Sequence, residues 1–467
     1  MRKKLYFVLM LVSISCLVLI SLLIFPRFFT RLPTPTSTSL EYVISQRRSF
    51  HAGDAAWDKS IPISSDLMKT VCKNAFSSGF NLSGMALYWA NSTACYQYDQ
   101  TTNSFVLHAA GDKRPQLASD VNQRVDNAPC IIIIVWDSQT EIDHFVASRK
   151  SGFIVQNLYL VAVRNNLGGC CVGAGMYRED VTANIQAHLS LAPNLKPMYL
   201  FPIGFLKAGF SYSTGNLTKT SGNLPSPLES ERNISDVFNE KKDLATAFGD
   251  TLSQQKLSNL LWSMYGYSLL GTGHRTVPTS YGVYPFQMYV CNGSGTYDYT
   301  ASTHSLSKIN SIDKRETIVA NAETPTYMNG APALIVVCWN SLGGSSNASD
   351  SDSKGRFINT NVGCCFQNLY LSANVWNISV SEIAYTTNYE ALRNNISDPL
   401  PSYVYPMYLV GVGEPNGTHS LNLHVKDWDL TNTILPVASS STKKKSSREV
   451  AGWRVQRALT ISPTGSP

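Results

Sequence analysis

The chain has 467 residues, which exceeds one ordinary hydrophobic core and suits two domains with extensions. Apolar residues make up 43% of the chain, so we expect a packed globular body, whereas only 15% of the residues are charged. The net charge of +6 is small for this length, and part of it lies in the terminal segments. No basic stripe of the kind that binds nucleic acid is visible in the sequence, and we expect no nucleic-acid partner.

An almost unbroken apolar run covers residues 5–25 and is long enough to span a bilayer. Basic residues at positions 2–4 precede it, so the positive-inside rule keeps the N-terminus in the cytoplasm and places the body outside. A cleaved signal peptide is the alternative, but no small-residue cleavage site follows the run. We therefore predict a cytoplasmic stub and single-pass membrane anchor over residues 1–25, an extracytosolic body, and a Pro/Thr/Ser-rich stalk over residues 26–44.

Nine Asn-x-Ser/Thr sequons agree with an outside location, although some are expected by chance in a chain rich in Asn, Ser and Thr. They begin at Asn81, Asn91, Asn216, Asn233, Asn292, Asn347, Asn377, Asn395 and Asn416. The ten cysteines can form disulfides in an oxidising compartment, but their pairing cannot be read from sequence. The vicinal pairs at 170–171 and 364–365 lack the Cys-x-x-Cys spacing of redox or zinc motifs. We expect buried thiols or ordinary structural disulfides, and no metal site.

An internal repeat organises the chain, because five matches occur in the same order in both halves. One is Gln-Asn-Leu-Tyr-Leu, which starts at Gln156 and again at Gln367. The other matches start at Tyr96 and Tyr297, at Asp112 and Asp313, at Ala128 and Ala331, and at Pro197 and Pro406. A Gly/Ser/Asp-rich insertion over 341–354, interpreted as a surface loop, lengthens the second copy.

Each copy is predicted to be α+β, because short β-branched runs and apolar positions at helical spacing both occur. In the first copy we expect a buried strand at 131–136, a helix at 153–163, and a strand at 199–203 that Gly204 ends. In the second copy we expect an amphipathic helix at 257–265, a strand at 333–339, a helix at 366–375, and a strand at 408–412 that Gly413 ends.

Composition also separates the copies. A Ser/Gly/Asn/Pro-rich stretch predicts a linker at 211–250, between a first domain at 45–210 and a second at 251–415. A polar tail is expected at 416–467.

With these motifs the chain resembles the nitroreductase superfamily, and within it the SagB-type dehydrogenases of azoline-peptide maturation. The first copy carries the likeness at 156–160, 166–173 and 199–204, and the second at 257–262, 275–285, 367–371 and 408–413. The resemblance covers about residues 45–415. It implies two tandem nitroreductase-like domains and bound FMN.

The resemblance assigns the FMN phosphate to Arg47, Arg48 and Ser49. Two guanidinium groups beside a hydroxyl suit a phosphate, although without the family context such a cluster is more often solvated surface. His51 stands where the family often has Arg or Lys, which departs from the pattern.

Two further segments are implied to line the flavin. A glycine-containing segment would let the backbone approach a flat ring, with a helix C-cap followed by a loop as the alternative. A Pro-Thr-Ser loop would present a hydroxyl and backbone N–H groups to the ring, with an ordinary turn as the alternative. The residues are Gly168, Gly169 and Gly173 in the first segment, and Pro278, Thr279 and Ser280 in the second.

Nitroreductases are usually dimers that bind flavin between subunits. A tandem chain is expected to form the equivalent pseudo-dimer internally, so the protein could act as a monomer. One composite site would take its arginines and glycines from the first copy and its Pro-Thr-Ser loop from the second. In the reverse site, 231–233 matches the arginines poorly, 378–384 has no glycine, 77–81 replaces the loop, and Asn74 stands where the second copy has Arg275. Sequons at 81 and 377 also fall there, so we expect one flavin site and one lost site.

These observations predict a membrane-anchored, extracytosolic, FMN-dependent oxidoreductase. The sequence names no catalytic acid or base, and it leaves open whether the substrate is a small molecule or a peptide. The alternative is a non-catalytic surface protein that uses a degenerate nitroreductase fold as a binding or structural scaffold. The departure at His51, the lost site and the many sequons favour that alternative.

Overall fold

The computed structural model describes residues 38–50, 56–173, 178–210, 222–240, 242–269, 274–279, 282–322, 326–342, 351–385, 389–396 and 400–416. The chain divides into two units, 1–38 and 39–467, and the fold described here is that of the second. The predicted anchor, most of the predicted stalk and nearly all of the predicted tail lie outside the described residues. Among the helices of the described ranges, none has the length and apolar character that a membrane span requires. The anchor therefore stays a prediction.

Two antiparallel sheets share one strand order, β3-β2-β1-β4-β6-β5 in the first and β11-β10-β9-β12-β15-β13 in the second, where β14 also pairs with β15. The first sheet consists of β1 (Met85–Ala90), β2 (Ala94–Asp99), β3 (Ser104–Ala110), β4 (Cys130–Asp137), β5 (Leu167–Gly169) and β6 (Leu195–Phe205). The second consists of β9 (Phe286–Asn292), β10 (Gly295–Thr300), β11 (Ser305–Asn310), β12 (Ala333–Asn340), β13 (Ser379–Val380), β14 (Ala384–Tyr385) and β15 (Val404–Gly413). The shared order confirms that the chain holds two copies of one α+β fold.

The central strands β4 and β12 confirm the predicted strands at 131–136 and 333–339. Both are buried along nearly their whole length, which explains their β-branched composition. The strands β6 and β15 extend beyond the predicted 199–203 and 408–412. Gly204 lies inside β6 and does not end it. A Cβ at this position would lie 2.3 Å from the side chain of Pro129, so the residue is glycine for a packing reason. This glycine allows close packing within a strand.

The helices also correspond in pairs. The pairs are α2 (Leu40–Gln46) with α7 (Ile234–Asn239), α3 (Ser65–Ala75) with α8 (Gln254–Tyr265), α4 (Arg114–Asp120) with α9 (Arg315–Asn321), α5 (His144–Arg164) with α10 (Ser351–Trp376), and α6 (Glu179–Leu189) with α11 (Tyr389–Ile396). The three predicted helices are confirmed as parts of α5, α8 and α10. The end of the loop predicted at 341–354 is instead the first turn of α10, and 343–350 lie outside the described residues. The segment predicted as a linker contains α7, whose apolar side chains are buried.

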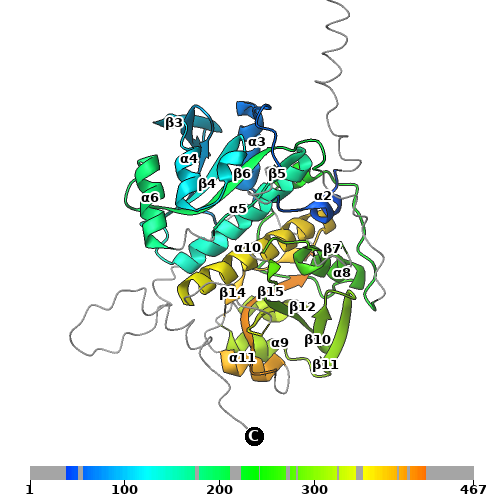
Figure 1. The fold of residues 1–467 in the computed structure, drawn as a ribbon. Helices are drawn as coiled ribbons and strands as arrows, with labels where there is room; N and C mark the ends of the chain where they lie inside the picture. Colours follow the sequence, from blue (N-terminus) through cyan, green and yellow to red (C-terminus); the bar gives the residue numbers. More distant parts are fainter. Residues whose placement is uncertain are drawn as a thin grey trace, which may run out of the picture. The chain divides into compact units, whose positions relative to one another are not determined.

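The two copies pack against each other where α5 and α10 lie side by side between the sheets (Figure 1). A Cβ at Gly152 of α5 would lie 2.1 Å from the carbonyl oxygen of Thr360 and 2.8 Å from Cα of Gly363. A Cβ at Gly363 of α10 would lie 2.1 Å from the carbonyl oxygen of Arg149. The contact is therefore reciprocal, and it brings the helix backbones closer than any side chain would allow.

Tyrosines of β6 and β15 add a second reciprocal contact. Tyr199 of the first copy has its hydroxyl 2.5 Å from Oγ1 of Thr360 in the second. Arg149 of the first copy donates to the hydroxyl of Tyr408 of the second at 3.0 Å. Tyr199 and Tyr408 are equivalent residues of the repeat, so the two copies contact each other as two subunits of a dimer do.

Replacing Gly363 with Ala should destabilise the protein by about 3 kcal/mol, because the new methyl group meets backbone that cannot move without separating the helices. Gly330 is the matched control, since a Cβ there meets nothing within 4 Å. Urea unfolding of the two variants measures the difference. Equal unfolding free energies would mean that the helix crossing does not require glycine.

Equivalent turns after β2 and β10 hold one residue each in the left-handed region, Asn103 with φ 48° and His304 with φ 52°. Tyr98 donates its hydroxyl to Oδ1 of Asn103 at 2.9 Å, and Nδ1 of His304 lies 2.9 Å from the hydroxyl of Tyr299. His304 is only 1% exposed, and its Nε2 lies 2.7 Å from Oγ of Ser258. Burial lowers the pKa of His304 to about 4, so the ring is neutral at pH 7.

His304 should make the protein less stable in acid. Its pKa is about 4 when folded and about 6.5 in an unfolded chain, so this stability is complete above pH 6.5 and is lost as the pH falls towards 4. The loss approaches about 3 kcal/mol. His304→Asn copies the residue at the equivalent turn and should flatten this part of the pH profile. Urea unfolding between pH 7 and pH 4.5 tests this, and an unchanged slope would contradict it.

Candidate functional site

Gln156 of α5 and Asn368 of α10 hold the chain that follows α8 in the second copy. Gln156 Nε2 donates to Oδ1 of Asn368 at 2.7 Å and to the carbonyl oxygen of Thr276 at 3.3 Å. Asn368 Nδ2 donates to the same Thr276 oxygen at 3.2 Å and to the carbonyl oxygen of Ser263 at 2.8 Å. All of these groups are buried, so the hydrogen bonds fix the backbone at Thr276.

The same arrangement recurs in the other half. Gln367 Nε2 donates to Oδ1 of Asn157 at 3.0 Å and to the carbonyl oxygen of Ser77 at 2.8 Å. Asn157 Nδ2 donates to the Ser77 oxygen at 2.8 Å and to the carbonyl oxygen of Ala75 at 3.2 Å. Ser77 is therefore the counterpart of Thr276, which makes Phe76 the counterpart of Arg275. The prediction that Asn74 replaces Arg275 was wrong by two positions.

Arg47 follows α2 and is 3% exposed, so it is not part of a solvated surface cluster. Its Nε donates to the carbonyl oxygen of Thr276 at 3.2 Å, and its Nη2 donates to that of Arg275 at 2.9 Å. Its guanidinium carbon lies 5.3 Å from the ring centroid of Tyr159. Nη1 is buried and has no hydrogen-bond partner among the described residues. A buried cation with one unused donor favours an anion as its partner.

Tyr159 joins two predicted segments of the first copy. Its hydroxyl lies 2.8 Å from Oγ of Ser49 and accepts a hydrogen bond from the backbone N–H of Cys171 at 2.8 Å. Close by, the backbone N–H of Phe50 donates to the carbonyl oxygen of Gly169 at 3.1 Å. Burial raises the pKa of Tyr159, so its hydroxyl stays protonated and is able to donate to Oγ of Ser49. The structure thus brings the segment after α2 next to the glycine segment.

The glycines themselves are explained by packing within the protein. A Cβ at Gly168 would lie 2.2 Å from the side chain of Leu206, and one at Gly169 would lie 2.3 Å from the ring of Phe201. Packing within the protein is therefore a second reason for both glycines, which the sequence did not show. The C-cap alternative fails, because Asn166, with φ 55°, turns the chain after α5.

Gly173 is half-buried just after the bridge between Val172 and Leu200. Whether Gly168, Gly169 or Gly173 contacts flavin stays a prediction.

The described part of the Pro-Thr-Ser loop lies against α10. Pro278 is buried, and Asn361 Nδ2 of α10 donates to Oγ1 of Thr279 at 3.1 Å, while that hydroxyl donates to the carbonyl oxygen of Val283. Ser280 and His51 lie outside the described residues.

Positive charge gathers at this end of the molecule. Burial, together with the charges of Arg47 and Arg48, lowers the pKa of His274. The structure therefore brings together Arg47, Arg48 and Ser49 of the first copy with residues 274–279 of the second.

The equivalent place in the other half of the molecule holds a different set of groups, in which burial and the charges of Arg232 and Lys256 lower the pKa of Lys242. Ser39 and Asn233, the N-caps of α2 and α7, form a β-bridge with each other, so they are counterparts. The segment that follows α7, which contains Lys242 and Asp243, is therefore the counterpart of the segment that follows α2, and the prediction that 231–233 occupies this place was wrong. A bridge between distant segments is not visible in the sequence.

Asp243 changes the charge of this second position. Both of its carboxylate oxygens are buried without a hydrogen-bond partner among the described residues, and burial raises its pKa. Tyr370, the counterpart of Tyr159, accepts from the backbone N–H of Lys242 and donates to its carbonyl oxygen, both at 2.8 Å. A carboxylate in this place repels a phosphate.

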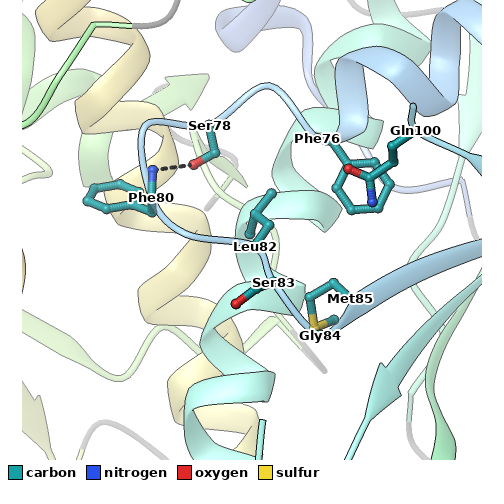
Figure 2. Close-up of a pocket in the computed structure, with 8 residues that line it drawn as sticks. All are labelled: Phe76, Ser78, Phe80, Leu82, Ser83, Gly84, Met85 and Gln100. Atoms are coloured by element: carbon teal, nitrogen blue, oxygen red, sulfur yellow. Dashed lines mark hydrogen bonds between the residues drawn. The ribbon is translucent and has the colours of Figure 1, made fainter. Parts of the chain in front are cut away.

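Phe80 occupies the second position from the side of the first copy. It points towards α10 (Figure 2), and its ring centroid lies 4.6 Å from that of Phe153 and 5.7 Å from that of Tyr370. The connection that carries Phe80 runs only from 76 to 84, whereas its counterpart runs from 266 to 285. Beside it lies an open hollow of about 290 Å³, lined by Phe76, Ser78, Phe80, Leu82, Ser83, Gly84, Met85 and Gln100 (Figure 2).

The cysteines within the described ranges are thiols, and all but Cys171 are buried. This agrees with the buried-thiol expectation. In the same ranges, no three His, Cys, Asp or Glu side chains come close enough to hold a metal ion.

The nitroreductase family matches residues 60–205 and 249–413, which together exceed half of the chain. The chain therefore belongs to the nitroreductase family and carries two copies of its domain. Members of this family typically use flavin.

Three similar proteins illustrate the match. A curated protein of Methanocaldococcus jannaschii, described as a nitroreductase, is 24% identical over 189 residues, which are 39% of this chain and 91% of that protein. A nitroreductase crystal structure from Anabaena variabilis has a TM-score of 0.60 at 12% identity and covers 79% of this chain and 92% of its own. An FMN-dependent nitroreductase from Clostridium difficile R20291 has a TM-score of 0.28 at 15% identity, with 37% and 90% covered. The second of these shows that the fold of both copies together occurs in another single chain.

Tyr159→Phe should release the glycine segment, because the backbone N–H of Cys171 loses its acceptor. We expect a loss of about 1–2 kcal/mol in unfolding free energy and faster hydrogen exchange at Cys171. Tyr370→Phe is the matched control, which should cost a similar free energy without changing exchange at Cys171. Hydrogen-exchange mass spectrometry measures both, and identical exchange in the two variants would contradict the assignment.

Proposed function

We propose that this protein is an FMN-dependent oxidoreductase with one flavin site, composed of residues from both copies of an intramolecular pseudo-dimer. The observation that carries the proposal is Arg47, a buried guanidinium of the first copy that is held by backbone of the second and keeps one unpaired donor. Membership of a flavin-using family makes the FMN phosphate the fitting anion.

The residues present suit a phosphate. Arg47 and Arg48 supply positive charge, and Ser49 is exposed beside the buried hydroxyl of Tyr159. Partial burial and the charges of Arg47 and Arg48 lower the pKa of His274, which disfavours a further cation at this place. In this proposal the arginines and Ser49 bind the phosphate, and the loop containing Pro278, Thr279 and Ser280 faces the ring.

When bound, FMN supplies the group that accepts and passes on a hydride. The chain supplies position: Thr276 and Arg275 orient Arg47, and α10 holds Thr279 through Asn361. Tyr159 acts as a hydrogen-bond donor and not as a base, because burial raises its pKa. No catalytic acid or base is proposed, and the substrate class is left open between small molecules and peptides.

The proposal limits the protein to one FMN. At the second position Asp243 places a buried carboxylate in the segment after α7, and Phe80 packs against Tyr370. Negative charge and a filled volume both oppose a second flavin.

The test is a titration of the purified full-length protein with FMN, followed by flavin absorbance and fluorescence quenching. We expect one FMN per chain. Arg47→Met should weaken binding about tenfold to a hundredfold, the effect of losing a hydrogen bond to a charged group. Lys242→Met is the matched control at the second position and should leave the affinity unchanged.

Two FMN per chain would contradict the single site, and an Arg47→Met protein with unchanged affinity would contradict the phosphate assignment. A protein that binds no FMN would instead favour the non-catalytic scaffold.

The proposal also includes a single membrane anchor at residues 1–25 and an extracytosolic body, supported by the apolar run, the basic residues before it and the sequons. Protease treatment of intact cells that express the full chain should digest the body, and carbonate extraction should leave the protein in the membrane fraction. A body protected from protease, or a protein released by carbonate, would contradict this arrangement.

A further inference from the structure

Arg275 lies in a cage of three tyrosines. It belongs to β8 (His274–Arg275), which pairs with β7 (Tyr267–Leu269) in the connection between α8 and β9. Its guanidinium carbon lies 4.3 Å from the ring centroid of Tyr265, 4.6 Å from that of Tyr267 and 5.1 Å from that of Tyr284. Its Nη1 donates to the carbonyl oxygen of Tyr265 at 2.8 Å. The side chain is therefore held by aromatic faces and one backbone oxygen.

The backbone of Arg275 meets Arg47 directly. The carbonyl oxygen of Arg275 accepts from Nη2 of Arg47 at 2.9 Å, and the next carbonyl oxygen, that of Thr276, accepts from Nε at 3.2 Å. Two donors of one planar guanidinium are thus fixed by two successive carbonyl groups. Because the guanidinium is planar, this also fixes the direction of its third nitrogen, Nη1.

The cage stabilises a cation without adding negative charge. Burial raises the pKa of Tyr265, so the phenol beside Arg275 is neutral. A carboxylate partner would hold an arginine equally well, but it would reduce the positive potential that Arg47 and Arg48 present to an anion. Tyrosine faces leave that potential intact, which suits an arginine that lies next to an anion site.

Among the residues that the structure describes, the other copy has no such cage. Phe76 is the counterpart of Arg275, and its ring stacks on that of Tyr98 at 6.3 Å between centroids. The cage therefore accompanies the half of the molecule that holds buried Arg47, and not the half where Asp243 and Phe80 lie.

We infer that Arg275 is a positioning residue of the composite site: held by Tyr265, Tyr267 and Tyr284, it presents the two carbonyl groups that aim Arg47 at the cofactor phosphate. This inference rests on the proposed FMN site. Arg275 does not touch the phosphate itself, and it acts through its backbone and through Arg47.

Arg275→Met tests the inference, because methionine keeps length and apolar packing but removes the cation that the tyrosines hold. We expect FMN to bind the full-length variant about tenfold more weakly. In the protein without FMN, hydrogen exchange in the connection from 266 to 285 should become faster. Arg275→Lys keeps the charge but not the planar fork, and it should recover part of the affinity.

Arg149→Met is the matched control for loss of stability. Arg149 lies over the ring of Tyr408 at 5.1 Å and donates to its hydroxyl at 3.0 Å, ten residues before Tyr159 on α5 and so about 15 Å away along the helix. This variant should lower the unfolding temperature and leave the FMN affinity unchanged.

An Arg275→Met protein that binds FMN as the wild type does, or an Arg149→Met protein that loses the same affinity, would overturn the inference. A wild-type protein that binds no FMN would overturn the proposed function instead. In that case, unchanged exchange of the connection in Arg275→Met would separately contradict the positioning role.

Discussion

The contact between Gly152 and Gly363 is the constraint on which the rest of the structure depends. Because the backbones of α5 and α10 touch there, the side chains one turn further along each helix reach into the opposite copy. Gln156 and Gln367 lie at that distance, and each binds a carbonyl oxygen of the opposite connection, that of Thr276 and that of Ser77. A wider crossing would leave these buried amides without partners, which costs more than the hydrogen bonds themselves contribute. The glycines therefore set both the spacing of the copies and the position of Thr276 and Ser77.

A symmetric frame carries two chemically different ends. At one end the connection is long, Arg47 is buried beside it, and the tyrosine cage holds Arg275. At the other end the connection is short, Asp243 brings a buried carboxylate, and Phe80 packs against Tyr370 of the other copy. In a homodimer any substitution appears at both sites, so one site cannot change alone. A tandem chain has no such restriction, because each half has its own sequence while the shared helix crossing maintains the fold.

The sequence predicted those parts of the fold that local pattern specifies. The strand at 131–136 could be recognised because it is β-branched on both faces, and the helices at 153–163 and 366–375 because their motif recurs. The packing around Gly168 and Gly169 could not be predicted, because a sequence cannot show that Leu206 and Phe201 occupy the space of the missing side chains. The site followed the same division. The cluster at Arg47 was visible in the sequence. The unpaired Nη1 of Arg47, the place of Asp243 in the second half and the cage around Arg275 were not, because they depend on contacts between distant segments. The three tyrosines near Arg275 were the one available signal.

A crystal structure of the full chain grown with FMN tests the central claim most directly, because it shows both positions at once. One FMN is expected, with its phosphate within hydrogen-bonding distance of Nη1 of Arg47 and its ring near Pro278 and Thr279. The position beside Asp243 and Phe80 should hold none. A phosphate bound by Lys242, or an FMN held by residues of a single copy, would contradict the composite site.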